Sequence, residues 1–335
     1  MNRILIPNRI PDQHQTMNFS SSPSPSFSPG FSPVLGTVIL ALAFVLGFPG
    51  NLFVLWTVLC RVAHRSVTCL LVLNLAAADT MVLLTTPFFM RYVAGGQGWE
   101  FGMAFCKLVH YLCGVNMYTS IFLITGMSLD RFLAVSRPFL SQQLRTKRTL
   151  LKTLLVIWSL AFLFAIPMPI YRSDPKHMIS QYLMETIAGF LIPFTIILFC
   201  SLYICWKLRS TVFENKSKSR QIILSIVVAF FVFWMPYHIV NLIQVSGALA
   251  GEESLKKALL DVVDTTKPNV TAFVFFSSSI NPILYVFAGS SNIRSDGLNF
   301  MAVMLEKTNS EMPGSRGFSQ PRRDSPENKT LSMST

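Results

Sequence analysis

The stretch that decides the fold runs from Cys106 to Pro138 and reads CKLVHYLCGVNMYTSIFLITGMSLDRFLAVSRP. Its residues 108–129 carry no formal charge and suffice to cross a bilayer as one helix. A helix over the whole stretch would span about 50 Å, so it must tilt or protrude from a hydrocarbon core of about 30 Å. Asp130 and Arg131 stand side by side where the apolar run stops. One helix therefore joins an end that carries candidate binding residues to an end that carries charges. The alternative is a long structural span whose polar residues only hold helices together.

Candidate binding residues share one face near the start of this stretch. Five residues follow helical spacing and so take neighbouring positions on one helix surface: His110, Cys113, Gly114, Met117 and Tyr118. Polar groups at mid-depth need partners inside a bundle of helices, because lipid offers none. The stretch places three such residues there: Asn116, Thr119 and Ser120.

The composition indicates that the chain lies in a membrane. Its 335 residues are 51% hydrophobic and only 13% charged, whereas soluble domains are about 25% charged. We therefore predict an all-α membrane protein that crosses the bilayer several times. The formal charge of +12 does not indicate nucleic-acid binding, because lysines and arginines lie in short loops and not in a basic stripe with aromatic residues. The six cysteines show no paired CxxC spacing, which argues against zinc.

Seven apolar runs follow one another along the chain, at about residues 34–59, 67–92, 102–136, 149–171, 178–208, 221–247 and 268–288. Arginine and lysine are enriched in the loops after the first, third and fifth runs. The positive-inside rule places these loops in the cytoplasm and the N-terminus outside. The sequence thus predicts a seven-transmembrane helix bundle in the plasma membrane, with its two termini on opposite sides.

The remaining segments are tails. Residues 1–33 are rich in Ser and Pro and lack an apolar signal segment, so we expect a disordered extracellular tail before the membrane domain of residues 34–288. Asn18 begins a glycosylation sequon in this tail. Residues 289–306 are expected to form a short amphipathic helix on the inner membrane surface. Residues 307–335 form a polar cytoplasmic tail, a candidate for phosphorylation and for arrestin binding.

Several spans carry a residue that is costly in a membrane. Asp79 is the only formal charge between Thr68 and Met90, and a lone intramembrane carboxylate marks a functional polar site by default. Pro236 and Pro282 each remove a backbone hydrogen bond from their helix and supply hinges. Each of these features, taken alone, also has a purely structural interpretation.

Together the motifs resemble the rhodopsin-like (class A) G-protein-coupled receptors over about residues 34–305. The matching elements are the Gly-Asn pair ending at Asn51, LAAAD ending at Asp79, Asp-Arg-Phe at 130–132, Trp158, FxxxWMP at 230–236 and NPILY at 281–285. Narrower matches resemble the leukotriene B4 receptors within this family: HYLCGVNMY, MSLDRFLAVSRPF, LRTK, FWMPYHIVNL and SSSINPILY. The resemblance implies a receptor that binds the lipid chemoattractant leukotriene B4 and signals to a heterotrimeric G protein of the inhibitory class.

The resemblance also implies roles for individual residues. Arg131 would be held by Asp130 at rest and would contact the G protein once released. Asn281, Pro282 and Tyr285 match the family's inner switch. An allosteric sodium ion would be held by oxygen atoms of four residues, with Asn116 as a neighbour: Asp79, Ser120, Ser278 and Asn281. No other cofactor is implied.

The outer halves of the spans indicate the chemistry of the ligand. Cys113 stands where amine-binding members of the family carry an aspartate, so a ligand ammonium would lack a partner. Candidate cations near the outer ends are Arg91, His110, Arg172 and Lys267. Hydrogen-bonding and apolar groups lie between them: Met90, Met117, Tyr118, Glu185, Trp234, Tyr237, His238, Asn241 and Phe275. Such a cavity suits an acid with a long apolar tail and hydroxyl groups.

Arg172 together with His110 is our candidate for holding the carboxylate or a hydroxyl of the ligand. The alternative for His110 and for His238 is that each only bridges helices. Phe230 and Trp234 match the aromatic pair above which ligands sit in the family.

One departure from the family concerns the outer disulfide. Cys106 occupies the position that the family ties to the following outer loop, yet that loop, RSDPKH at residues 172–177, contains no cysteine. Either a segment is missing from this chain or the receptor lacks the clamp, and we favour a missing segment. A native disulfide contributes about 2–5 kcal/mol, so poorer folding or trafficking of this chain is expected.

Three other classes of protein are less well supported. A secondary transporter would show internal repeats and paired broken helices, and the seven runs show neither. An intramembrane enzyme needs a nucleophile with its base or a set of metal ligands, which Asp79 alone does not supply. A class A receptor for another lipid or peptide chemoattractant is the closest alternative, because it would share the fold and the mechanism but not the ligand.

Overall fold

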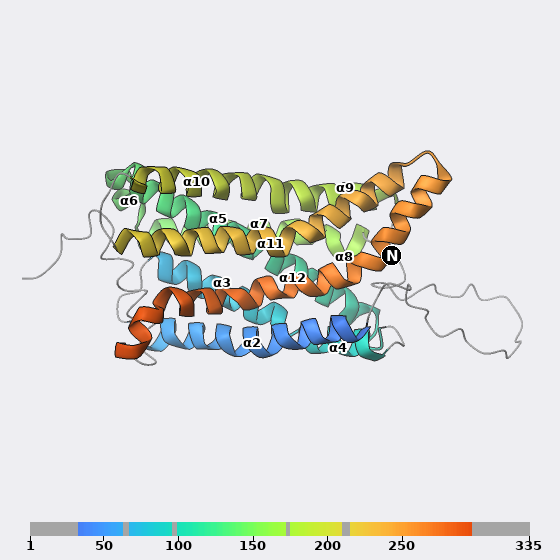
Figure 1. Cartoon of the computed structure of the whole chain (residues 1–335), viewed down its shortest axis with the longest axis horizontal. Coiled ribbons are helices and arrows are strands. Elements are labelled where there is room, and N and C mark those ends of the chain that lie inside the picture. Colours follow the sequence, from blue (N-terminus) through green and yellow to red (C-terminus); the bar gives the residue numbers. More distant parts are fainter. Residues whose placement is uncertain (1–32, 63–66, 96–98, 172–174, 210–214, 297–335) are drawn as a thin grey trace, which may run out of the picture.

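The computed structural model describes residues 33–62, 67–95, 99–171, 175–209 and 215–296, and every regular element in these ranges is helical (Figure 1). In chain order the elements are α2 (Pro33–Cys60), α3 (Val67–Leu83), α4 (Thr86–Gly95), α5 (Met103–Ser136), α6 (Pro138–Leu144), α7 (Lys147–Ala165), α8 (Pro167–Tyr171), α9 (Pro175–Thr186), η1 (Ile187–Leu191), α10 (Ile192–Arg209), α11 (Asn215–Leu249) and α12 (Glu253–Asp296). Apart from Pro33, the two predicted tails lie outside the described residues. The predicted amphipathic segment 289–306 is helical up to residue 296 and lies outside them thereafter.

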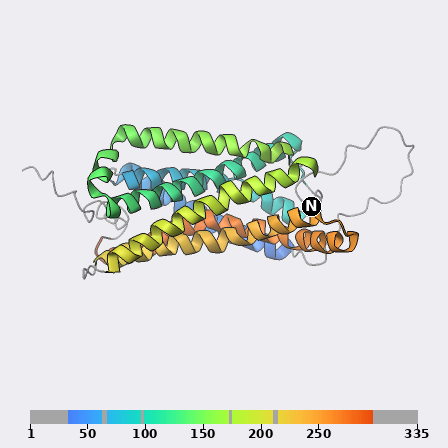
Figure 2. The same cartoon turned by 90° about the horizontal axis from the view of Figure 1, so that it is seen from above.

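The helices lie side by side along the long axis of the molecule (Figures 1 and 2). Six stretches of the described chain are each long and apolar enough to cross a membrane: Pro33–Cys60, Val67–Gly95, Met103–Ser136, Lys147–Ile170, His177–Lys207 and Val228–Leu249. The seventh predicted span lies within α12, which packs against α2 and α11. The prediction of an all-α bundle of seven spans is therefore confirmed.

The helix that the sequence places at the centre, α5, does lie there. It packs against α3, α7 and α10. In its most apolar window 61% of the residues are buried, against 28% in α2, which leaves much of its apolar surface for lipid. Val115, Tyr118 and Ile121 of α5 are fully buried. The other spans are thus arranged around the stretch that carries the candidate binding face and the charged Asp-Arg pair.

Prolines explain where the predicted spans are interrupted. α3 ends at Leu83 and α4 begins at Thr86, because Pro87 has no backbone N–H to donate to the carbonyl oxygen of Leu83. Pro167 separates α7 from α8 for the same reason. Just before Pro193 the helix widens into the π-turn η1, which makes room for the proline ring. The regular α-helix is therefore interrupted at these points, while each stretch remains a single candidate membrane span.

The outer end of α12 differs from the prediction. The apolar runs at 221–247 and 268–288 leave residues 248–267 between them and predict a loop there, but α12 begins at Glu253 and continues through Pro268 as one helix. Its first turns and the last turns of α11 form a helical hairpin at the end of the molecule opposite α6 (Figures 1 and 2). Glu253 in the first turn stabilises the helix through the helix dipole. Gly247 lets the two helices approach, since a Cβ there would lie 3.2 Å from the Cβ of Leu259.

An aromatic cluster holds the outer end of α5, where the family's disulfide is absent. All six cysteines belong to the described residues, and none of them forms a disulfide. Trp99 packs against Phe101 and Phe105 with ring centroids 5.3 and 6.0 Å apart. Its indole N–H donates a 3.0 Å bond to the carbonyl oxygen of Gly102, whose φ of +80° favours a residue without a side chain. Packing of the loop before α5 thus fixes the start of this helix without a covalent bond.

Close contact between α2 and α12 positions the middle of the bundle. A Cβ at Gly47 would lie 2.5 Å from the Oγ atom of Ser279, so only glycine lets the helices approach this closely. Ser279 donates a 2.7 Å bond to the carbonyl oxygen of Ala43. The Nδ2 atom of Asn51 bridges the same helices, with 2.9 Å bonds to the carbonyl oxygens of Gly47 and Ser278. These bonds hold α12 against α2, at the level where the next turn of α12 meets α3.

Candidate functional site

A polar centre lies midway along the bundle, between α3, α5 and α12. Asp79 is fully buried and accepts hydrogen bonds through both carboxylate oxygens. The Nδ2 atom of Asn281 lies 2.8 Å from Oδ2, while Asn116 Nδ2 and Ser120 Oγ lie 3.3 and 3.4 Å from Oδ1. The hydroxyl of Ser278 donates a 3.4 Å bond to the Oδ1 atom of Asn116. The structure therefore brings together all four residues named for sodium, with Asn116 between them.

A small cavity adjoins this polar centre. Its volume of about 20 Å³ is enough for one water molecule or one ion. Its polar lining comes from Asp79, Ser120, Ser277 and Asn281, and the rest is Trp234 and other apolar side chains. Carboxylate, hydroxyl and amide oxygens are the ligands that hard cations take, so the donor set fits a sodium ion. Within the described residues no group of three His, Cys, Asp or Glu side chains is placed to hold a metal ion.

A second polar group lies in the outer half of the bundle, between α9 and α11. Glu185 is fully buried, and its Oε1 atom accepts a 2.7 Å bond from Gln181 Nε2. Its Oε2 atom accepts bonds of 2.9 Å from Tyr237 OH and 3.3 Å from Asn241 Nδ2. A carboxylate has about four acceptor positions, so one position is left for a further donor. We call Glu185, its three donors, Tyr118 and His238 the outer polar cluster.

Four buried polar atoms of this cluster have no hydrogen-bond partner among the described residues: Tyr118 OH, Gln181 Oε1, His238 Nε2 and Asn241 Oδ1. The ring of Tyr118 lies beside Gly189, one turn after Glu185, where a Cβ would be 3.4 Å from it. The other ring nitrogen of His238 lies 3.3 Å from the hydroxyl of Thr186. Buried polar atoms normally have partners because their desolvation costs free energy. Hydroxyl groups of a ligand would satisfy them.

Aromatic rings close the inner side of the outer polar cluster. The imidazole of His238 stacks on Phe190, with ring centroids 4.8 Å apart, and lies 6.1 Å from Trp234. Phe230 follows at 6.4 Å from Trp234. Met117 belongs to the same buried apolar cluster. The predicted aromatic pair therefore lies next to the predicted residues of α5 and α11.

The predicted binding face of α5 is divided between two neighbours. His110 packs edge-on against Phe89 of α4, with ring centroids 6.3 Å apart, and its Nδ1 atom lies 2.8 Å from the carbonyl oxygen of Cys106. Cys113 packs into the same apolar cluster. Tyr118 instead contacts Phe164 of α7. Eight residues along a helix turn by about 80°, so His110 and Tyr118 do not point the same way.

Sequence reasoning missed part of the outer half. Gln181, Thr186 and Gln244 are buried there and bind residues that the sequence did single out. Lys267, expected as an outer cation, is fully buried: its ammonium donates to the amide oxygen of Gln244 and lies 3.7 Å from the ring centroid of Tyr182. Residues 237, 241 and 244 share one helix face by their spacing, and this pattern was the available signal that Gln244 belongs with the polar residues named on α11. Arg91, by contrast, is exposed and pairs with Glu100 at 3.1 Å.

The charged inner end of α5 corrects one expectation. Asp130 does not hold Arg131 but accepts two bonds from Arg145, of 3.0 Å from Nε to Oδ1 and 2.5 Å from Nη2 to Oδ2. Arg131 donates a 3.3 Å bond to the hydroxyl of Thr68 in α3. Adjacent residues of a helix do not face each other, whereas α6 carries Arg145 back to Asp130.

Some named residues lie outside the described part of the chain. This holds for Asn18, for Arg172 and for the side chain of Tyr285. Pro282 is described and packs against α2, since a Cβ at Gly50 would lie 2.9 Å from the Cβ of Pro282.

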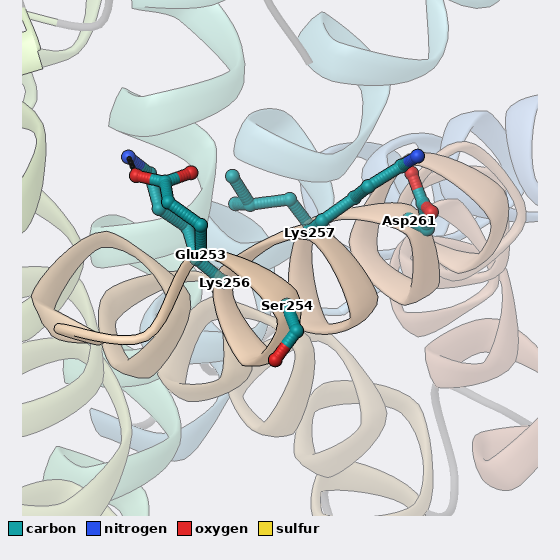
Figure 3. Close-up of a pocket in the computed structure, with 6 residues that line it drawn as sticks. Glu253, Ser254, Lys256, Lys257 and Asp261 are labelled. Carbon is teal, nitrogen blue, oxygen red and sulfur yellow. Dashed lines mark hydrogen bonds and ion pairs between the residues drawn. The ribbon is translucent and has the colours of Figure 1, made fainter.

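A larger hollow lies on the first turns of α12 (Figure 3). It measures about 570 Å³ and is lined by Glu253, Ser254, Lys256, Lys257, Leu260 and Asp261, all from this one helix. The ammonium of Lys256 pairs with Glu253 at 3.0 Å, and Figure 3 shows Lys257 reaching toward Asp261. The whole lining comes from this one helix, and the open shape of the hollow does not bury a ligand. The outer polar cluster is the better candidate for the binding site.

Comparison with known proteins agrees with this arrangement. The family described as 7 transmembrane receptor (rhodopsin family) matches residues 50–285. Leukotriene B4 receptor 1 of Homo sapiens is 40% identical over 313 residues, which cover 89% of each chain. Leukotriene B4 receptor 2 of Homo sapiens is 37% identical over 84% of this chain and 83% of its own, and the type-1 angiotensin II receptor of Meleagris gallopavo is 31% identical over 76% and 77%. The resemblance in the motifs is confirmed, and the chain belongs to the rhodopsin family of seven-transmembrane receptors.

Proposed function

We propose that this chain is a plasma-membrane receptor, with its N-terminus outside, that binds leukotriene B4 and signals to a heterotrimeric G protein of the inhibitory class in leukocyte chemotaxis and inflammation. The observation that carries the proposal is the outer polar cluster, whose Tyr118, His238 and Asn241 each keep a buried polar atom without a partner among the described residues. The relatives named as leukotriene B4 receptors are 40% and 37% identical, more than the angiotensin receptor at 31%.

The chemistry of the cluster suits a hydroxylated acid. A ligand hydroxyl donates to the open acceptor position of Glu185 and accepts from the Tyr118 hydroxyl. The rings of Phe190 and Trp234 offer apolar surface beside these groups. Lys267 and its partner Gln244 lie further out, where a cation suits the ligand's carboxylate. Arg172 with His110 stays a candidate for the same role.

Tyr118→Phe tests this site by removing one oxygen atom. We expect the affinity for leukotriene B4 to fall about tenfold, because the variant loses one hydrogen bond worth about 1.5 kcal/mol. The measurement is saturation binding of radiolabelled leukotriene B4 to membranes of cells that express the full chain. Tyr111→Phe is the matched control, because its hydroxyl bonds the backbone of Phe162 at an exposed position. Equal affinity in Tyr118→Phe and in the unchanged chain would place the ligand elsewhere, and no binding by either would favour another chemoattractant.

Asp79 and its neighbours are proposed to hold the allosteric sodium ion. An ion in the 20 Å³ cavity would stabilise one arrangement of α3, α5 and α12, and a ligand that prefers the other arrangement would bind less well in its presence. We expect replacement of choline by sodium, at constant ionic strength, to lower leukotriene affinity about fivefold in the unchanged chain and not at all in Asp79→Asn. A sodium effect that persists in Asp79→Asn would place the ion elsewhere.

The rest of the proposal concerns segments outside the described residues. We propose glycosylation at Asn18 and binding of arrestin to the tail of residues 307–335.

The matching family is one of receptors and not a class of enzymes, and we propose no catalytic activity for the chain.

A further inference from the structure

Arg145, at the end of α6, competes with Arg131 for the carboxylate of Asp130. α6 follows α5 directly, and Arg145 caps its C-terminal end with its backbone N–H on the carbonyl oxygen of Ser141. Ser141 is buried and α6 packs against α5, so the segment is folded back onto the helix. The side chain of Arg145 thereby reaches Asp130, which lies 15 residues earlier in the chain.

The pair between Arg145 and Asp130 is shielded and uses both carboxylate oxygens. The two side chains are 22% and 14% exposed. Nε donates to Oδ1 and Nη2 to Oδ2, the forked geometry in which arginine binds a carboxylate most strongly. Exposed ion pairs contribute little to a structure, but a largely buried and bidentate pair is not of that kind. The carboxylate of Asp130 is thus directed toward α6.

Arg131 is directed toward α3. It donates a bond to the hydroxyl of Thr68, in the first turn of α3. Because adjacent residues of a helix do not face each other, Arg131 would have to bend back to reach Asp130. A carboxylate whose two oxygens already bind another guanidinium attracts it less.

We propose that Arg145 is a positioning residue for signalling, which holds Asp130 and so keeps Arg131 available to the G protein. This inference rests on the role of Arg131 in the proposed function. When Arg145 is removed, a largely buried carboxylate is left without its partner, and pairing with Arg131 satisfies it. Arg131 is then withdrawn from the inner surface, while the outer polar cluster is unchanged. Signalling falls although the ligand still binds.

The test measures basal and leukotriene B4-stimulated GTPγS binding to G protein in membranes from cells that express the full chain at matched surface levels. Arg145→Ala is expected to lower both rates at least about fivefold. Adding Asp130→Asn to Arg145→Ala is expected to restore them, because an amide carries no charge to capture Arg131. Arg145→Lys, which keeps the charge without the fork, gives an intermediate rate. Arg148→Ala is the matched control, because it removes an exposed cation three residues further along the chain, in the first turn of α7.

Each other outcome overturns the inference. Faster exchange in Arg145→Ala would mean that the pair restrains the receptor, and a loss that Asp130→Asn does not repair would mean that Arg145 only supports the fold of α6. Arg131→Ala is measured alongside. Normal exchange in Arg131→Ala would remove the proposed role of Arg131 itself, whereas a silent Arg131→Ala with a normal Arg145→Ala would contradict the role of Arg145 alone.

Discussion

Arg131→Ala is expected to abolish leukotriene B4-stimulated nucleotide exchange and to leave the affinity for leukotriene B4 within about twofold of the unchanged chain. Its guanidinium lies at the inner end of α5, bound to Thr68, while Tyr118 of the outer polar cluster is 13 residues away on the same helix. At 1.5 Å per residue this separation is about 20 Å, too far for a direct effect on the ligand. GTPγS binding measures the exchange. Radioligand binding measures affinity, with excess guanine nucleotide added to both membrane preparations. The nucleotide uncouples the receptor from the G protein, so the affinities of Arg131→Ala and of the unchanged chain are compared in the same uncoupled state.

Arg137→Ala is the matched control for this variant. Arg137 follows α5 directly, is exposed and carries the same charge, so its removal tests whether any inner arginine has the effect. We expect its exchange rate to stay close to that of the unchanged chain. Arg131→Ala that signals normally at equal surface expression would show that the G protein does not depend on this guanidinium.

Glu185→Ala is expected to lower the affinity for leukotriene B4 about 100-fold. The change removes the acceptor of three buried bonds, from Gln181, Tyr237 and Asn241, and leaves these donors without their carboxylate. It also removes the open position that a ligand hydroxyl would use. The lost hydrogen bond between the ligand and the carboxylate, which contributes up to about 3 kcal/mol, accounts for a change of this size. Saturation binding to membranes with matched amounts of surface receptor measures it.

Two further variants separate a binding role of Glu185 from a structural one. Glu185→Gln keeps the shape and one acceptor oxygen, so we expect a loss of about tenfold. Glu100→Ala removes an exposed acid paired with Arg91 and is expected to bind leukotriene B4 normally. Unchanged affinity in Glu185→Ala would show that the outer polar cluster is not the binding site.

The sequence predicts the fold and the polar centre because membranes constrain both strongly. Apolar runs of about 20 residues mark the spans. A lone carboxylate such as Asp79 must find its partners among polar groups at its own depth, and few are available. The resemblance to the family implied the grouping of Asn116, Ser120 and Asn281 with Asp79, and the structure brings all three into contact with its carboxylate.

Contacts that depend on how the chain turns back could not be predicted in the same way. Arg145 reaches Asp130 only because α6 folds against α5, and no periodic pattern records that turn. The resemblance suggested Arg131 as the partner of Asp130, and this was wrong. The loop expected at residues 248–267 was also wrong, because its charged residues mark a segment outside the membrane and not the absence of a helix.

The outer polar cluster was predicted in part. Glu185, Tyr237 and Asn241 were named for their hydrogen-bonding groups, but the bonds that join them required the relative rotation of α9 and α11. The same rotation buries Lys267 beside Gln244, a residue that the sequence did not single out. His110 and Tyr118 were placed on one face, although the pitch of α5 directs them to different neighbours.

The central claim is that leukotriene B4, bound between α5, α9 and α11, drives nucleotide exchange at the inner end of the same bundle. Leukotriene B4-stimulated GTPγS binding in membranes of cells that express the full chain tests it most directly. We predict a saturable increase in exchange that requires Arg131 and shifts to higher ligand concentration in Glu185→Ala. A chain that reaches the cell surface and shows no leukotriene-dependent exchange would contradict the claim.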